Sequence, residues 1–280
     1  MENKTEKQII ITGPTSGVGR VMAIELAAPG VNLTLACRDV ARGEQLAQEI
    51  LRDKPTAGVE VMQIDTSSQA SVRAFARRYR ETHDRLDVLI NNAGLSRGAL
   101  PRENSVDGIE LTFATNVLGY FLLTHELLDL IMSSAPARIL NVASEFASDL
   151  DLNDLQFERR PFDSMKAYAQ SKACDRLLTW ALARRLAGSG VTANAMTPGL
   201  VTETGLYRNA APQLLGILRS RSNRTIAQGA DTAIWLAASP EVEGVSGKFF
   251  FDRHEVECQF RDEADEERLW TICAEMTGTG

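Results

Sequence analysis

The feature that most limits the possible folds is a glycine-rich turn near the start of the chain. Residues 8–11 (Gln-Ile-Ile-Ile) have the composition of a short buried strand, and residues 12–19 (Thr-Gly-Pro-Thr-Ser-Gly-Val-Gly) follow directly. Apolar residues then recur with helical spacing up to Leu26. A strand, a glycine turn and a helix N-terminus form a phosphate cradle, because glycines let backbone N–H groups approach the anion and the helix dipole favours its charge. This unit predicts an α/β fold that binds a phosphate-bearing ligand.

Strands and helices continue to alternate along the chain. Further strands are expected at residues 31–36, 59–64, 86–90, 138–142, 191–196 and 247–251. A chain of 280 residues with 44% hydrophobic content can bury a complete α/β core, and no change of composition marks a second domain. We therefore predict one doubly wound Rossmann-type domain over residues 1–280, with a seven-stranded, mostly parallel sheet and helices on both faces.

Composition excludes several classes of partner. The net charge of −7 argues against nucleic acid, because a duplex-binding surface needs a concentrated basic patch. No apolar run approaches the roughly 20 residues of a membrane span, so we expect no membrane span and a cytoplasmic protein. The cysteines lack metal-ligand spacing, and we predict no disulfide and no metal site. They are Cys37, Cys174, Cys258 and Cys273.

Tyr168 and Lys172 lie four residues apart, so a helix would place them one turn apart on the same face. A phenol ionises near pH ~10, and a positive charge beside it lowers its pKa. Such a phenol passes a proton at neutral pH, so we predict that Tyr168 is a general acid or base. Because many amphipathic helices carry this pair by chance, it is informative only together with other motifs.

Other motifs supply that support. They are Asn91-Asn92-Ala93-Gly94 after the fourth expected strand, Asn116, Ser144 and Pro198-Gly199. With residues 12–19 and the Tyr168–Lys172 pair, they follow the order and approximate spacing of the short-chain dehydrogenase/reductase family. The sequence resembles this family over nearly its whole length. Residues 35–39, 153–168 and 268–270 look most like its retinol-dehydrogenase-like subgroup.

The resemblance implies a role for each of these residues. Tyr168 would exchange the proton, and Lys172 would lower its pKa and bind the nicotinamide ribose. Ser144 would orient the substrate oxygen, and Asn116 would relay protons, with a buried structural role as the alternative for Asn116. The implied cofactor contacts are Gly13, Thr15, Ser16, Gly17, Val18, Gly19, Arg38, Asp65, Thr66, Asn92, Ala93, Gly94, Tyr168, Lys172, Pro198, Gly199, Val201 and Thr202.

Two of these contacts have alternatives. Asp65 could also cap the helix that follows it, a role shared with Ser67 and Ser68, and both roles of Asp65 could hold. After Pro198-Gly199, family members of this kind usually have threonine where Glu203 stands. The hydroxyl that contacts the nicotinamide is therefore that of Thr202 or of Thr204, and we expect Thr202.

Arg38 follows the second expected strand, where a side chain faces the adenosine ribose of a dinucleotide. A guanidinium suits the 2′-phosphate of NADP, whereas an acid would suit the ribose hydroxyls of NAD. We therefore predict NADP(H) as the cofactor. The neighbouring Asp39 could compete for the arginine, and a solvated strand end is the alternative interpretation of Arg38.

Residues 205–225 follow the expected nicotinamide turn and contain many large apolar side chains. They predict a substrate lid over an apolar pocket, with an ordinary packed helix pair as the alternative. Residues 253–280 are expected to form a C-terminal helical extension. Residues 146–163 form an acidic insertion that could oppose one mode of dimerisation, so the protein would be a homodimer or a monomer.

These expectations combine into one prediction of function. The protein would be an NADP(H)-dependent oxidoreductase that transfers hydride between the nicotinamide and a carbonyl or alcohol carbon of a lipophilic small molecule, as a ketone or aldehyde reductase. The alternatives are a double-bond reductase of the same family and a non-catalytic NADP(H)-binding sensor or interaction protein. All four catalytic positions are filled, which favours an enzyme.

Overall fold

The structure is a computed structural model that describes residues 6–221 and 224–280. Within these residues, eight strands form one sheet in the order β3-β2-β1-β4-β5-β6-β7-β8. The chain reverses its direction across the sheet between β1 and β4, as in other doubly wound folds, and the predicted fold class is confirmed. The strands are β1 (Lys7–Thr12), β2 (Val31–Cys37), β3 (Gly58–Gln63), β4 (Val88–Asn91), β5 (Ala137–Val142), β6 (Val191–Met196), β7 (Phe249–Phe251) and β8 (His254–Glu255).

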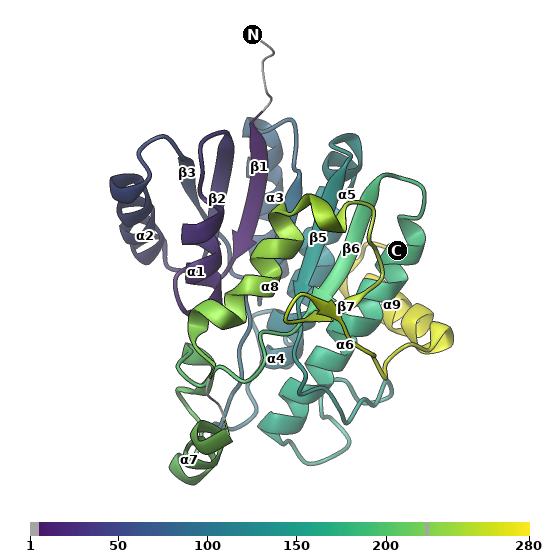
Figure 1. Cartoon of the computed structure of the whole chain (residues 1–280). Coiled ribbons are helices and arrows are strands. Elements are labelled where there is room, and N and C mark those ends of the chain that lie inside the picture. The colour runs from purple at the N-terminus through teal and green to yellow at the C-terminus, as the bar shows by residue number, and fades with distance from the viewer. Residues whose placement is uncertain (1–5, 222–223) are drawn as a thin grey trace.

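Helices cover both faces of the sheet (Figure 1). α1 (Gly17–Leu26), α2 (Val40–Asp53) and α8 (Ile226–Ala238) lie on one face. α3 (Gln69–Thr82), α5 (Gly119–Ser133) and α6 (Ser164–Arg185) lie on the other. None of the helices within the described residues is both long enough and apolar enough to cross a bilayer.

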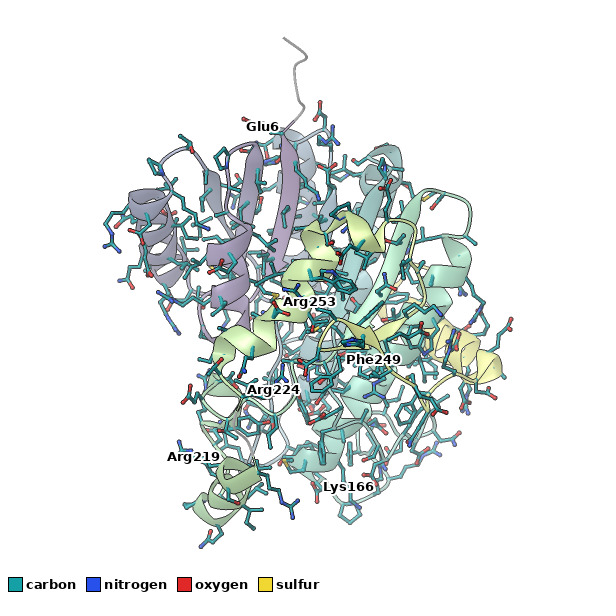
Figure 2. The ribbon with its side chains drawn as sticks, viewed as in Figure 1. Glu6, Lys166, Arg219, Arg224, Phe249 and Arg253 are labelled. Carbon is teal, nitrogen blue, oxygen red and sulfur yellow. The ribbon has the colours of Figure 1, made fainter. Side chains whose placement is uncertain are left out.

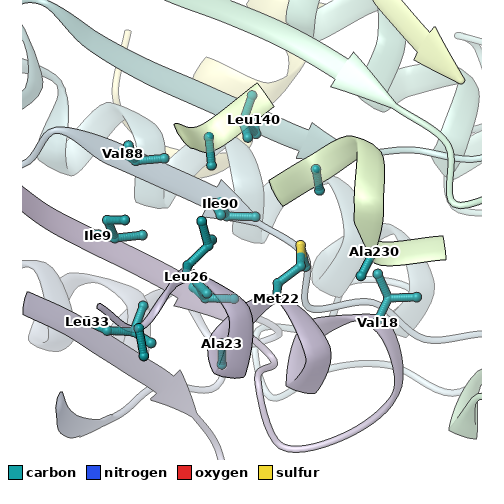
Figure 3. Close-up of a cluster of buried hydrophobic side chains, with 14 of the residues drawn as sticks. Ile9, Val18, Met22, Ala23, Leu26, Leu33, Val88, Ile90, Leu140 and Ala230 are labelled. Carbon is teal, nitrogen blue, oxygen red and sulfur yellow. The ribbon is translucent and has the colours of Figure 1, made fainter. Parts of the chain in front are cut away.

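The central strand β1 contributes to the core on both sides. Ile9 packs with Met22 of α1 on one face, as Figure 3 shows. Ile10 points the other way and packs with Phe75 and Tyr79 of α3. Side chains alternate along a strand, so an uninterrupted apolar strand is what a sheet covered on both faces requires.

The eighth strand is a short addition to the seven that the sequence predicts. Asp252 and Arg253 turn the chain with φ angles of 48° and 62°, and β8 returns antiparallel to β7. Arg253 fixes this turn by donating its backbone N–H to the Thr232 hydroxyl (3.1 Å) and by pairing with Asp231 of α8.

The helical segment that contains Asn116 has a change of pitch. α4 (Leu111–Phe113) continues through a π-helical turn, η1 (Ala114–Leu118), into α5. Glu110 caps its start by accepting the backbone N–H groups of Thr112 (2.9 Å) and Phe113 (2.7 Å). Such π turns are rare and often occur at functional sites. Asn116 lies inside this one and is fully buried.

The C-terminal helix α9 (Glu263–Thr277) packs along α6. Leu269 and Cys273 are buried in this contact. Arg184 and Arg185 of α6 each donate to Glu267 at 2.9 Å. A helix therefore occurs within the extension that the sequence predicts.

The insertion at residues 146–163 contains no helix or strand before α6 begins. It is ordered by Asp154, whose carboxylate accepts the backbone N–H groups of residues 158, 159 and 160 at 2.7, 3.2 and 3.1 Å. Burial opposes the charge of Asp154, but these three hydrogen bonds outweigh it and lower the pKa of the carboxyl.

Candidate active site

The loops at the carboxyl ends of the parallel strands enclose a cavity of about 500 Å³. The predicted site residues that line it are Gly13, Thr15, Ser16, Gly17, Val18, Gly19, Arg38, Asp65, Thr66, Asn92, Ala93, Gly94, Ser144, Tyr168, Lys172, Pro198, Gly199 and Val201. Two predicted site residues, Asn116 and Thr202, do not line it. Residues far apart in the sequence are thus brought together at the edge of the sheet where α/β proteins bind ligands.

The glycine-rich turn is held tightly against the loop after β4. The Thr12 hydroxyl accepts the backbone N–H groups of Asn92 (2.9 Å) and Ala93 (3.0 Å). The Asn92 amide donates to the carbonyl oxygens of Thr12 (2.8 Å) and Gly13 (3.1 Å). A Cβ at Gly19 would lie 2.4 Å from Asn92 Nδ2, so no larger residue fits. α1 begins at Gly17 beside the cavity, and its N-terminus suits a pyrophosphate.

Two guanidinium groups border the cavity after β2. Arg38 is exposed and makes no hydrogen bond or ion pair within residues 6–221 and 224–280. Asp39 does not compete for it, because its carboxylate caps α2 by accepting the backbone N–H of Arg42 (3.1 Å). The Arg42 side chain also lines the cavity and donates to the Thr15 carbonyl oxygen (3.2 Å). Two cations at one end of a cavity suit a phosphate group.

Asp65 lines the cavity after β3 and orders the turn that follows. Its Oδ1 accepts the backbone N–H (3.0 Å) and the hydroxyl (2.7 Å) of Ser67. The N-cap of α3 is Ser68, which accepts the backbone N–H of Ser71. Of the three residues predicted to share the cap, Ser68 is the N-cap, and Asp65 is not.

Ser144, Tyr168 and Lys172 converge from two elements. Ser144 follows the end of β5, and α6 presents Tyr168 and Lys172 to the same cavity. The Lys172 ammonium lies 6.0 Å from the centroid of the Tyr168 ring. It donates to the Val142 carbonyl oxygen (2.9 Å) and to Asp175 Oδ2 (2.8 Å).

The ionisation of Tyr168 depends on its burial and on its neighbours. Burial raises the pKa of Tyr168 to about 12, the hydrogen bond with Ser144 opposes this rise, and the Asp175 charge adds to it. Burial also opposes the charge of Lys172, but Asp175 and Tyr120 together raise the pKa of the lysine. Burial has the largest effect on the pKa of Tyr168, and the Lys172 ammonium is paired with Asp175. That Lys172 lowers the pKa of Tyr168 stays a prediction.

Asn116 supports the cavity from behind. Its Oδ1 accepts the backbone N–H of Leu95 (2.9 Å), and its Nδ2 donates to the Leu95 carbonyl oxygen (3.0 Å) and to the Ser171 hydroxyl (2.9 Å). Leu95 itself lines the cavity. Both amide hydrogens of Asn116 are therefore used, which fits the structural role given above as the alternative, and the proton relay stays a prediction.

The turn after β6 places Thr204 on the cavity wall, whereas Thr202 is buried away from it. A Cβ at Gly17 would lie 3.3 Å from the Thr204 side chain, so Thr204 lies against the glycine turn. The Thr204 hydroxyl donates to the Val201 carbonyl oxygen (3.2 Å). Thr204 and not Thr202 therefore lines the cavity, and the threonine that contacts the nicotinamide stays a prediction.

The segment predicted as a lid has two parts, and residues 222 and 223 of it lie outside the described residues. η2 (Gly205–Tyr207) and Asn209 line the cavity, and the Asn209 carbonyl oxygen accepts the Ala99 backbone N–H (2.7 Å) from the opposite wall. α7 (Pro212–Arg221) projects beyond the sheet (Figure 1) and contains no buried residue. The apolar side chains of α7 therefore do not line the cavity, and the lid stays a prediction.

Arg224 anchors the chain where it returns from α7 to α8. It donates to the Pro198 carbonyl oxygen (3.1 Å) and pairs with Asp252 (2.6 Å). Figure 2 shows Arg224 near the sheet and Arg219 at the outer edge of the molecule. The base of this segment is thus fixed to the turn that carries Pro198 and Gly199.

A family model described as short chain dehydrogenase matches residues 7–214. The chain belongs to the short-chain dehydrogenase family. It is 39% identical to retinol dehydrogenase 12 of Mus musculus over 276 residues, covering 97% of this chain and 86% of that protein. It is 40% identical to retinol dehydrogenase 14 of Homo sapiens over 294 residues, with the same two coverages. Its place in the retinol-dehydrogenase-like subgroup is confirmed.

Solved structures of this fold include the NADP complex of RhlG from Pseudomonas aeruginosa. That structure has a TM-score of 0.71 and 27% identity, covering 87% of this chain and 93% of its own. An uncharacterised protein from Mycobacterium Paratuberculosis has a TM-score of 0.77 and 30% identity, covering 98% of this chain and 94% of its own. This short-chain dehydrogenase is therefore an oxidoreductase by family, with a nicotinamide cofactor site.

Two side chains of this short-chain dehydrogenase's cavity region were not predicted from the sequence. Arg42 stands four residues after Arg38, in the first turn of α2, and a search for a second cation near Arg38 would find it. Asp175 stands three residues after Lys172 on α6, a spacing at which helical side chains meet.

Proposed function

We propose that this short-chain dehydrogenase transfers hydride between NADP(H) and the carbonyl or alcohol carbon of a lipophilic small molecule, as a ketone or aldehyde reductase. One observation carries the proposal: a single cavity joins the glycine turn and Arg38 to Ser144, Tyr168 and Lys172. When bound, the reduced nicotinamide supplies the hydride. The retinol dehydrogenase relatives and the RhlG complex with NADP support the same class of reaction.

The residues of the cavity fit such a cofactor. Backbone N–H groups of the glycine turn would hold the pyrophosphate. A Cβ at Gly19 would clash with Asn92 and Gly13, so the packing of this turn requires glycine there. Arg38 and Arg42 would hold the 2′-phosphate. An ammonium has three N–H donors, and Lys172 uses two within the protein, so the third would bind the nicotinamide ribose.

The proton would come from Tyr168. With a pKa raised to about 12 by burial, the phenol is protonated at neutral pH, which is the form that donates to the oxygen of a carbonyl being reduced. The Ser144 hydroxyl would bind the same oxygen and stabilise the charge that develops on it. For Asn116 we propose the supporting role described above.

We expect this protein to bind NADPH at least roughly 10-fold more tightly than NADH, the size of one charge-assisted contact of ~1.5–3 kcal/mol. Arg38→Ala should remove most of this preference, because the guanidinium has no other partner in the described chain. Fluorescence titration of both cofactors measures it. The control is Arg52→Ala, because Arg52 is an exposed arginine of α2 that does not line the cavity. Equal affinities of the wild type for the two cofactors would refute the assignment.

The substrate end of the cavity combines apolar walls with two arginines, Arg97 and Arg208, and Arg208 donates to the Gly205 carbonyl oxygen (2.9 Å). Leu95, Leu111 and Leu206 line it. Arg97 also lines it, but its guanidinium pairs with Glu103 (2.7 Å). Since burial of apolar surface contributes ~25 cal/mol per Å², a bulky lipophilic carbonyl compound should bind better than a sugar or a phosphorylated one.

A series of ketones of increasing apolar bulk tests this substrate class. We expect kcat/KM to rise with bulk in the wild type and to fall roughly 10-fold for the bulkiest ketone in Leu206→Asn, because an apolar contact is lost. Ile217→Asn is the matched control, because Ile217 is 52% exposed on α7 and does not line the cavity. Highest kcat/KM for sugar or phosphorylated carbonyls would contradict the lipophilic assignment.

A further inference from the structure

Asp175 is a buried acid that contacts the lysine of the site. Its carboxylate lies 2.8 Å from the Lys172 ammonium, and the two side chains are 0% and 4% exposed. The ammonium is held on a second side by the Val142 carbonyl oxygen at the end of β5 (2.9 Å). Two of its three donors are thus fixed by the protein, so the position of the cation depends on Asp175.

The other side of Asp175 faces a small cavity of about 20 Å³, lined also by Tyr120, Thr124, His125 and Trp270. Asp175 Oδ1 and the Tyr120 hydroxyl are both buried, and neither has a hydrogen-bond partner among the described residues. A cavity of this size holds one water, and a buried carboxylate oxygen requires a donor. The carboxylate thus has an oxygen for the lysine and a second that one water in this cavity would satisfy.

The peptide that carries Asp175 is fixed by a buried polar network. The Asp175 carbonyl oxygen accepts the Thr179 hydroxyl (2.6 Å), and Thr179 in turn accepts from the Asn141 amide (2.9 Å). Asn141 accepts from Asn91 (2.9 Å) of the neighbouring strand. Strands β4 and β5 thereby position the helix turn that carries the acid.

The charge of Asp175 acts on both neighbours in the site. Burial raises the pKa of Asp175 to about 6, against the lowering effect of Lys172. Above pH about 6 the Asp175 carboxylate is charged. Its negative charge opposes the effect of the positive charge of Lys172 on the pKa of Tyr168. The titratable and charged side chains that face the Asp175–Lys172–Tyr168 group are Cys174 and Arg176 of α6, Tyr120 and His125 of α5, Cys273 of α9 and Tyr207 of η2.

We propose that Asp175 is a positioning residue of the reaction, whose carboxylate fixes the Lys172 ammonium against the end of β5 and offsets the effect of that positive charge on Tyr168. The inference rests on the proposed function insofar as that function makes Tyr168 the proton donor. The electrostatic effect on Tyr168 does not depend on turnover. It is therefore measured on its own.

The experiment is an ultraviolet titration of tyrosine ionisation, with the folded state checked by circular dichroism at each pH. Four tyrosines occur in the chain, and subtracting the titration of the matching Tyr168→Phe protein isolates the contribution of Tyr168. In Asp175→Asn we expect the midpoint of Tyr168 to fall by roughly one pH unit, since the amide keeps the shape but removes the charge. Asp175→Glu, which keeps the charge, should stay close to the wild type.

Two further variants make the result specific. His125→Gln changes another titratable group of the small cavity and should leave the midpoint unchanged. If Asp175→Asn alone does not fold, Lys172→Met is compared with Lys172→Met/Asp175→Asn, because replacing both members of a buried ion pair is tolerated better than removing one. The double variant Lys172→Met/Asp175→Asn should have the lower midpoint of Tyr168 ionisation.

An unchanged midpoint in Asp175→Asn, or an equal shift in Asp175→Glu, would overturn the proposal. The wild-type assay with NADPH and ketones separates it from the proposed function. A shifted midpoint in a protein without carbonyl reduction would support the electrostatic role of Asp175 and refute the proposed reaction. Turnover together with an unshifted midpoint would support the proposed reaction and refute the electrostatic role of Asp175.

Discussion

Tyr168→Phe should lower kcat for carbonyl reduction by at least the ~10²-fold typical of losing a general acid, while the Kd for NADPH stays nearly unchanged. The substitution removes only the phenol oxygen, so the ring keeps its packing in the cavity wall. The proton that the developing alkoxide needs then has no donor at the position of the phenol. Initial rates of NADPH oxidation give kcat, and fluorescence titration gives Kd.

Tyr79→Phe is the matched control for this change. Tyr79 is also a buried tyrosine, but it lies in the core under α3 and not in the cavity. Its turnover should equal that of the wild type. If Tyr168→Phe also kept near-wild-type turnover, another group would have to supply the proton, and the role given to Tyr168 would be wrong.

Lys172→Ala should have a larger effect, because it removes both a ribose contact and the counter-ion of Asp175. We expect kcat/KM to fall by more than in Tyr168→Phe, and the Kd for NADPH to rise roughly 10-fold for the lost charge-assisted contact. Lys166→Ala, exposed on the same helix and visible at the edge of the molecule in Figure 2, is the control. Retention of both turnover and NADPH affinity in Lys172→Ala would contradict the assignment.

Lys172→Ala should also be less stable than the wild type, by an amount that depends on pH. Without the lysine, Asp175 is a buried carboxyl whose folded-state pKa lies further above its unfolded value of ~3.9. Above pH ~3.9 the folded state keeps a proton on Asp175 that the unfolded state has released. The free energy of unfolding therefore falls as the pH rises above ~3.9. Urea unfolding measures the free energy of unfolding of Lys172→Ala against that of the wild type. We expect it to be slightly lower at pH ~5 and about 3–5 kcal/mol lower at pH ~8.

The layered fold could be predicted from the sequence because most central strands are rich in apolar residues and are followed by a turn. The eighth strand could not. β8 has two residues, and its turn uses Asp252 and Arg253 at positive φ, where glycine or asparagine is the usual signal of a hairpin. Contacts with Asp231 and Thr232 of α8 hold that turn, and they are visible only in three dimensions.

The residues of the site could likewise be predicted from the sequence only in part. Motifs identify which residues reach the cavity, but not the partners that decide their charge. Whether Lys172 acts on Tyr168 or pairs with Asp175 depends on a few ångströms of side-chain placement. The π turn at Asn116 and the rotation that favours Thr204 over Thr202 are likewise set by tertiary packing, which periodicity does not reveal.

The most direct test of hydride transfer follows an isotope from the cofactor to the product. NADPH deuterated at C4 of the nicotinamide, on the transferred side, is incubated with the protein and a bulky ketone, and the product is analysed by mass spectrometry and NMR. The account predicts one deuterium per product molecule, bound to the carbinol carbon. Deuterium at a carbon that was part of a double bond would instead indicate double-bond reduction, and NADPH binding without any labelled product would contradict catalysis by this site.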